Sequence, residues 1–515
     1  MSKRLTISLF GLILLAVCAA AQDTPTEPAP QPPVPAFGTD NPTLLPASEN
    51  PPISGLDLPN LEPHGAPLSY LQAGAHFSES VDSNIQNSLG GSSLSTITRA
   101  LGSLELQRLW SNYDLTLDYL GGVGYYQATG LGLKQIEELG VNQKVSWKRG
   151  YLGVRDAFSY QPEGTFGSSY GSIGATGAGL AGTSTFNGGS ALGALGQVPR
   201  IMNLTLLDAV ENLTPKSAIT VTGGYGFVHF LGNELGTNAA FIGNSQISAE
   251  IGYDRVLGPH DQGALVYGYQ GFQFSTGVDF HSHVIQAMWG HRISGRMDFV
   301  VSAGPQFTQI NNLLTTVNNP TAADTTPPCV LQFTATSASL ECPENDLRIS
   351  AAGRALFRYR FPKASMEVTY DHYLTSGSGF FAGAESDIAR VSVSRPLNRI
   401  WSVYSDIGYS RNSRVSSLTA TQLAGCSPSL TNQNPPPCPG TSANVYQYGF
   451  AGAGIHRMFG HTFHAFASYQ FNDLTFDSSY CSATVGTTAG PCNRTSQRSV
   501  GTVGLDWTPR PMRID

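Results

Sequence analysis

The chain has 515 residues, of which 41% are hydrophobic, 13% charged and 10% aromatic, and it contains 57 glycines. This low charged fraction is not typical of a soluble enzyme surface, and the glycine and aromatic content favours a sheet-rich protein. The formal net charge of −7, without a basic patch, excludes nucleic acid as an expected partner.

Residues 1–21 have the layout of a cleaved secretory signal peptide. A charged start precedes an apolar run and three alanines, and this order predicts export with cleavage before Gln22. The alternative, a lipid-modified Cys18, is disfavoured because Val17 stands where a lipoprotein signal carries a small residue.

Residues 22–67 form a proline-rich segment with thirteen prolines. Such a composition cannot build a packed domain and favours an extended chain. The segment is therefore predicted to be a periplasmic tether, and it is too short for a plug domain.

Six cysteines remain after the predicted cleavage. An exported chain favours disulfides, and separations of 13, 12 and 11 positions predict three local bridges. Pairings between neighbouring loops and free thiols are the alternatives, whereas the spacing disfavours a metal site. The predicted pairs are Cys329 with Cys342, Cys426 with Cys438, and Cys481 with Cys492.

Past Leu68, segments of about ten residues alternate apolar with polar side chains, and no run of about 18 apolar residues occurs that could form a spanning helix. In HTFHAFASYQFN, for example, Phe463, Tyr469 and Phe471 fall on one face and Gln470 on the other. A soluble sandwich would also alternate, so the period alone does not decide between the two folds.

The connections favour a membrane barrel, because tight turns alternate with long polar loops. On this basis we predict an all-β, antiparallel up-and-down barrel of about 18 strands, with 16 as the alternative, over residues 68–511, followed by a tail at 512–515. The predicted strands are 68–78, 95–110, 113–127, 134–149, 150–161, 201–213, 217–231, 245–257, 262–275, 283–295, 297–310, 347–361, 365–377, 386–398, 400–414, 443–459, 461–476 and 495–508.

This pattern resembles the porin-like outer-membrane β-barrels of Gram-negative bacteria. In the terminal strand, Thr502, Gly504 and Trp507 resemble part of the barrel-assembly signal, although Pro509 stands where a final aromatic is usual. The resemblance implies an integral outer-membrane protein that contacts lipid, the barrel-assembly machinery and small hydrophilic solutes, with a homotrimer as a possible assembly. It also places all three cysteine pairs in external loops.

If the apolar faces meet lipid, the opposite faces line a pore. One strand then projects a ladder of arginines inward, and other strands contribute acids that would face this basic stripe across the pore, an arrangement that would orient dipolar solutes. The alternative is that these charges only satisfy one another. The pore-lining candidates are Arg348, Arg354, Arg358, Arg360, Arg390, Glu105, Asp118, Glu250, Asp298, Glu367, Asp371 and Asp406.

The glycine-rich segment 161–200 is the longest predicted loop. By analogy with general porins, it is expected to fold into the barrel and narrow the pore, the alternative being a loop with no fixed place.

The sequence predicts no enzyme, no cofactor and no metal site, because the histidines are scattered and no nucleophile motif occurs. Two hypotheses remain for function. One is a porin-like channel for passive or weakly selective diffusion of small hydrophilic solutes. The other is a structural or surface-binding barrel with a blocked lumen and disulfide-stapled external loops.

Overall fold

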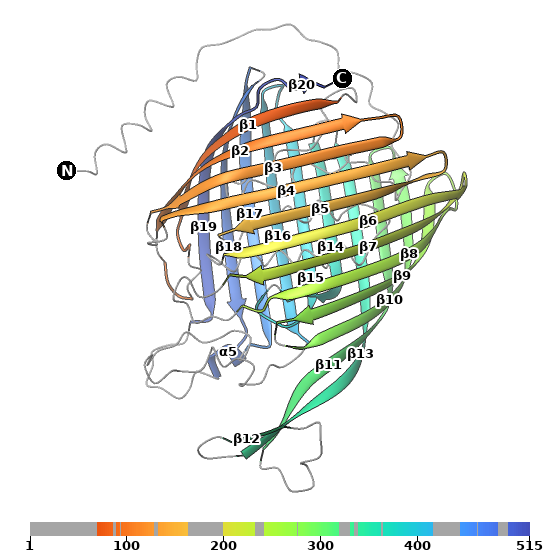
Figure 1. Cartoon of the computed structure of the whole chain (residues 1–515), viewed down its shortest axis with the longest axis vertical. Helices are drawn as coiled ribbons and strands as arrows, with labels where there is room; N and C mark the ends of the chain where they lie inside the picture. The colour runs from red at the N-terminus through yellow and green to blue at the C-terminus, as the bar shows by residue number, and fades with distance from the viewer. Residues whose placement is uncertain are drawn as a thin grey trace, which may run out of the picture. The chain divides into compact units, whose positions relative to one another are not determined.

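The computed structural model describes residues 69–85, 89–92, 94–127, 132–162, 199–231, 241–275, 277–318, 330–333, 338–361, 364–377, 379–415, 443–460, 462–482 and 493–514. It is a closed antiparallel β-barrel (Figure 1). The barrel strands are β1 (Tyr70–Asp82), β2 (Ser95–Leu109), β3 (Tyr113–Tyr126), β4 (Gly132–Trp147), β5 (Gly150–Gln161), β6 (Arg200–Thr214), β7 (Ser217–Phe230), β8 (Asn244–Val256), β9 (Asp261–Phe274), β10 (Asp279–Ser294), β11 (Met297–Asn318), β13 (Ala338–Phe361), β14 (Ala364–Thr375), β15 (Ala384–Pro396), β16 (Trp401–Arg414), β17 (Val445–Phe459), β18 (Phe463–Phe476) and β19 (Thr495–Trp507).

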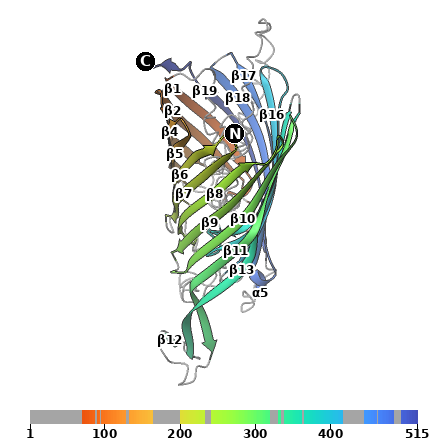
Figure 2. The same cartoon turned by 90° about the vertical axis from the view of Figure 1, so that its right-hand side faces the viewer.

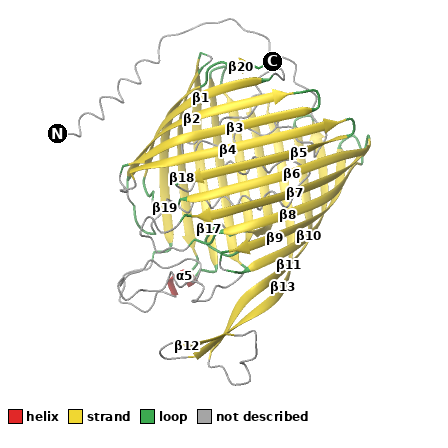
Figure 3. Cartoon of the chain, in the orientation of Figure 1, coloured by secondary structure: helices red, strands yellow, loops and turns green. Residues whose placement is uncertain are grey.

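Each barrel strand pairs with the next along the chain, and β1 pairs with β19 to close the sheet. Three small elements lie outside the wall: β12 (Val330–Phe333), β20 (Met512–Arg513) and α5 (Ser479–Ser482). Strands dominate the described chain (Figure 3). The predicted count of 18 barrel strands is therefore confirmed.

The two ends of the barrel differ in their connections. Tight turns such as Trp147–Gly150 and Ser294–Met297 join strands at one end, where β20 also pairs with the start of β1. We call this the short-turn end and the opposite end the long-loop end. In bacterial outer-membrane barrels the short turns are periplasmic.

Strand bounds depart from the prediction by more than two residues in three places. The strand β10 begins at Asp279, not at 283. The first strand was expected at 68–78 but runs to Asp82, because its pairing with β2 continues to Ser95. Strands β11 and β13 extend beyond their neighbours as a hairpin that also carries β12 (Figure 2). The predicted strand at 347–361 is thus only the barrel portion of β13.

The outer face is apolar. Phe77, Ile251, Leu265 and Ile407 are 54%, 52%, 60% and 56% exposed, and their neighbours along each strand are buried or half-buried. Because successive side chains of a strand point to opposite faces, those neighbours face the barrel interior. No helix in the described part of the chain is long and apolar enough to cross a membrane.

Tryptophans mark the short-turn edge of this outer face. Trp110, Trp147, Trp289 and Trp507 all lie near the short-turn ends of their strands and are 43–47% exposed. Aromatic girdles at this position are typical of the membrane–water interface. The outer surface therefore has the layout of a barrel embedded in a bilayer.

Candidate functional site: the barrel interior

A group of paired charges lines one wall of the interior. Arg358 lies 2.7 Å from Asp298, and Arg354 lies 3.3 Å from Asp371. On the next strands Arg390 contacts Asp406 at 2.7 Å. Together with Glu367, these form what we call the arginine–carboxylate cluster: Asp298 on β11, Arg354 and Arg358 on β13, Glu367 and Asp371 on β14, Arg390 on β15 and Asp406 on β16.

The strand register brings these groups together. Arg358 is the register partner of both Asp298 and Glu367, and Arg354 is the partner of Asp371. Side chains of register partners share a face of the sheet. The predicted arrangement, with arginines facing acids across the pore, is corrected for Asp298 and Asp371, which lie beside the arginines on one wall.

Four other predicted residues lie elsewhere. Arg348 sits toward the long-loop end of β13, half-exposed and 3.0 Å from Asp346. Glu105 and Asp118 are register partners on β2 and β3, and the Tyr70 hydroxyl donates a hydrogen bond to Glu105. Glu250 is buried on β8, away from the cluster by strand order.

The remaining predicted sites fall outside what the structure describes. These sites include the side chain of Arg360 and the glycine-rich segment from 163 to 198. Four of the paired cysteines also lie outside the described residues: Cys329, Cys426, Cys438 and Cys492. The backbone of Cys342 on β13 and of Cys481 in α5 is described, but their side chains are not.

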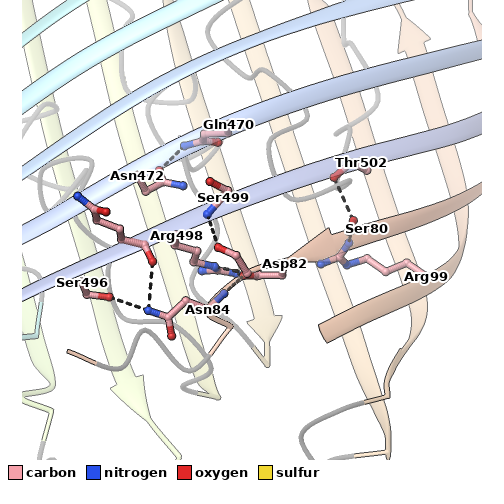
Figure 4. Close-up of polar contacts among 12 residues, drawn as sticks. Ser80, Asp82, Asn84, Arg99, Gln470, Asn472, Ser496, Arg498, Ser499 and Thr502 are labelled. Atoms are coloured by element: carbon pink, nitrogen blue, oxygen red, sulfur yellow. Dashed lines mark hydrogen bonds and ion pairs between the residues drawn. The ribbon is translucent and has the colours of Figure 1, made fainter. Parts of the chain in front are cut away.

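A polar network missed by the sequence analysis lies where the barrel closes (Figure 4). The Arg498 guanidinium on β19 donates to the Asp82 carboxylate on β1 at 2.5 and 2.7 Å, and the exposed fractions of these side chains are 3% and 0%. Beside them, Arg99 donates to Ser80 at 2.8 Å, and Ser80 shares a 3.0 Å hydrogen bond with Thr502. We call this the seam network.

Nearer the short-turn end, a second chain of contacts crosses the same seam. His76 lies 2.8 Å from Asp506 through Nδ1 and 2.8 Å from the Ser103 hydroxyl through Nε2. Hydrolases use a serine, a histidine and an aspartate connected in this way, but they also need hydrogen-bond donors that stabilise an oxyanion. The backbone around Ser103 is paired with β1 and β3 in the sheet, so these contacts act to join three strands.

An apolar barrier occupies the interior at the long-loop end. The turn between β14 and β15 carries Phe380 and Phe381, which are 7% and 0% exposed. Phe380 packs on Tyr446 and Phe476 with ring centroids 5.3 and 5.6 Å apart. Burial raises the pKa of Tyr480, which stacks on Phe476, to about 12, so its hydroxyl stays neutral.

Glycines hold this turn in place. Gly377 and Gly383 have φ of +75° and +81°, which residues with a Cβ rarely adopt. A Cβ on Gly383 would also stand 1.9 Å from the Phe280 ring. The Ile242 backbone N–H donates to the Gly379 carbonyl at 2.9 Å, which ties the inward turn to the segment before β8.

Comparisons with known proteins find similarity of structure only. No family model and no curated protein matches the chain. OccK2 (OpdF) of Pseudomonas aeruginosa aligns at a TM-score of 0.40 and 8% identity, covering 85% of this chain and 98% of that one. OccK5 (OpdH) of the same organism gives 0.38 and 11%, covering 87% and 100%. The ferric-catecholate import receptor Fiu of E. coli gives 0.41 and 8%, covering 85% and 81%.

At these sequence identities and TM-scores, no functional residue is assigned to this chain from the matches. The classification of the barrel rests on its own structural features. The sheet is closed, its outer face is apolar with a tryptophan edge, and its short turns gather at one end. These are the features of barrels that span bacterial outer membranes. The chain therefore has the architecture of an integral outer-membrane β-barrel.

Proposed function

We propose that the protein is a channel through which small hydrophilic solutes diffuse past the arginine–carboxylate cluster. The observation that supports this proposal most directly is the solvent exposure of the inward-facing arginine side chains. Arg354, Arg358 and Arg390 point inward, yet 25%, 27% and 27% of their side-chain surface is exposed. Water therefore reaches the interior wall, and an 18-stranded barrel is wide enough for an aqueous path.

The apolar barrier narrows the long-loop end of this path. Hydrophobic constrictions in channels control conduction by excluding water, so solutes would pass from a narrow apolar entrance into a wider charged region. Because the cluster contains three arginines and four acids, its formal charge is close to balanced. We therefore propose weak ion selectivity in the unmodified channel.

Single-channel recording in a planar bilayer tests the proposal. We expect discrete conductance steps and, under a salt gradient, a small reversal potential. Silence of a protein that is shown to be folded would reject an open channel and favour the structural, blocked barrel.

Removing the two β13 arginines should change selectivity. With Arg354→Gln and Arg358→Gln, the carboxylates of Asp298 and Asp371 lose their cationic partners, so the lumen becomes more acidic and cation preference should rise. The measurement is the reversal potential under a salt gradient. Arg348→Gln removes one positive charge at an exposed position outside the cluster and serves as the control, to be compared with each of the two single variants. Equal shifts in the control and in the single variants would remove the cluster from the proposed path.

A further inference from the structure

Strands β5 and β6 carry polar side chains on the face that elsewhere meets lipid. Asp156 lies midway along β5, and it shares the outward face with Val154, which is 37% exposed. On β6, Asn203 and Thr205 share the outward face with Leu207, which is 41% exposed. We call Asp156, Asn203 and Thr205 the outer polar patch.

The three side chains form one hydrogen-bonded unit. The Thr205 hydroxyl donates to Asp156 at 2.6 Å, and the Asn203 amide nitrogen lies 3.2 and 3.3 Å from the two oxygens of the same carboxylate. The acceptor is thus on β5 and both donors are on β6. The carboxylate retains further acceptor capacity, because it has about four acceptor sites, whereas the Asn203 amide nitrogen also donates to the Ala157 carbonyl at 3.4 Å.

The patch is not the result of a slipped register. The inward face of the same two strands carries Ala157, Met202, Leu204 and Leu206, which are at most 5% exposed and belong to the same hydrophobic cluster as Phe380. Around the outer polar patch the usual polarity of a barrel wall is therefore inverted, although the ion pair of Arg155 and Asp208 also lies on the inward face of these strands. A one-residue shift would expose this apolar row and bury the carboxylate.

A carboxylate at mid-depth on a lipid-facing surface is unfavourable, and ionisable groups within a membrane usually contact protein or water. Across membrane interfaces, Asn and Thr side chains form hydrogen bonds between protein segments. The outer polar patch therefore requires a cover other than lipid tails.

We propose that this cover is a second copy of the chain, in a dimer whose two-fold axis runs along the membrane normal between β5 and β6. A rotation of 180° about that axis places β5 of each copy against β6 of the other at the same height. Asp156 then faces Asn203 and Thr205 of its partner, so the spare acceptor sites of each carboxylate lie opposite amide and hydroxyl hydrogens that can be shared between the two carboxylates. An isologous interface of this kind must be self-complementary, and the patch has that property.

Cysteine cross-linking tests this geometry. Val154 and Leu207 are register partners on β5 and β6, so in the dimer Val154 of one copy opposes Leu207 of the other. Full-length V154C and L207C proteins, carrying tags of different size, are co-reconstituted in lipid vesicles and oxidised. We expect the mixed product to exceed that from V154C mixed with V391C, because Val391 is equally exposed but lies on β15. Equal yields would overturn the proposal.

A second measurement compares oligomeric mass in lipid nanodiscs. The wild type is expected to be dimeric and the triple variant D156V/N203V/T205V monomeric, with its folded state checked by the heat-dependent gel mobility of the barrel. A monomeric wild type, or a variant that stays dimeric, would contradict the proposed interface. Neither assay depends on conductance, so a silent channel would leave this inference standing.

Discussion

Replacing Asp82 with alanine is expected to lower the free energy of unfolding by about 3–5 kcal/mol, the usual effect of removing one partner of a buried ion pair. Arg498 would then keep its charge at a site where its side chain is only 3% exposed. The interaction that is lost joins β1 to β19, where the barrel closes (Figure 4). Urea denaturation of the reconstituted protein, followed by tryptophan fluorescence, measures the change.

An exposed pair provides the control. Arg348 and Asp346 are 3.0 Å apart, but their side chains are 47% and 42% exposed, so Asp346→Ala should cost less than about 1 kcal/mol. The double variant D82L/R498L removes both buried charges and should be more stable than D82A alone. A D82A protein no less stable than D346A would show that the buried pair does not hold the seam.

Replacing Phe380 and Phe381 with serine is expected to raise the single-channel conductance roughly twofold or more, because a hydrophobic constriction that excludes water would become wettable. The two rings fill the interior at the long-loop end, and Phe381 packs on Tyr446 at 5.1 Å between ring centroids. The same change removes buried apolar surface, so lower stability is also expected. Planar-bilayer recording gives the conductance.

The matched control is an aromatic residue on the outer face. Phe77→Ser changes the same side chain at a position that is 54% exposed, so conductance should not change. If folded F380S/F381S conducts as the wild type does, the inward turn is not the constriction, and the narrow part of the path lies elsewhere.

The fold could be predicted because its signals are local. Alternation of apolar and polar residues, interrupted by tight turns, is repeated within each stretch of ten to fifteen residues, so β9 and β16 were located to within one residue at each end. The alternation of apolar and polar residues is less regular in β5 and β6, because polar residues of β6 such as Asn203 and Asp208 fall on opposite faces. Only the register shows which of these faces is outside.

The interior could be predicted less well because it depends on contacts between distant residues. Asp82 and Arg498 are 416 positions apart, and nothing near either residue in the sequence identifies the other. The arginines of β13 were identified as inward-facing, but their acidic partners depend on the register with β11 and β14. The inward turn at Phe380 is short and glycine-rich, so it resembles an ordinary surface turn until its contacts are known.

The separation of Asp82 from Arg498 also has a consequence for assembly. Contacts between neighbouring strands can form early in folding, but β1 and β19 can close the barrel only after every intervening strand is in place. Until then both edge strands are open, and each carries a charged side chain that closure will bury. Such charges discourage an open edge from pairing with the strand of another molecule. The pair would thus protect the unfinished barrel from aggregation before it stabilises the finished one.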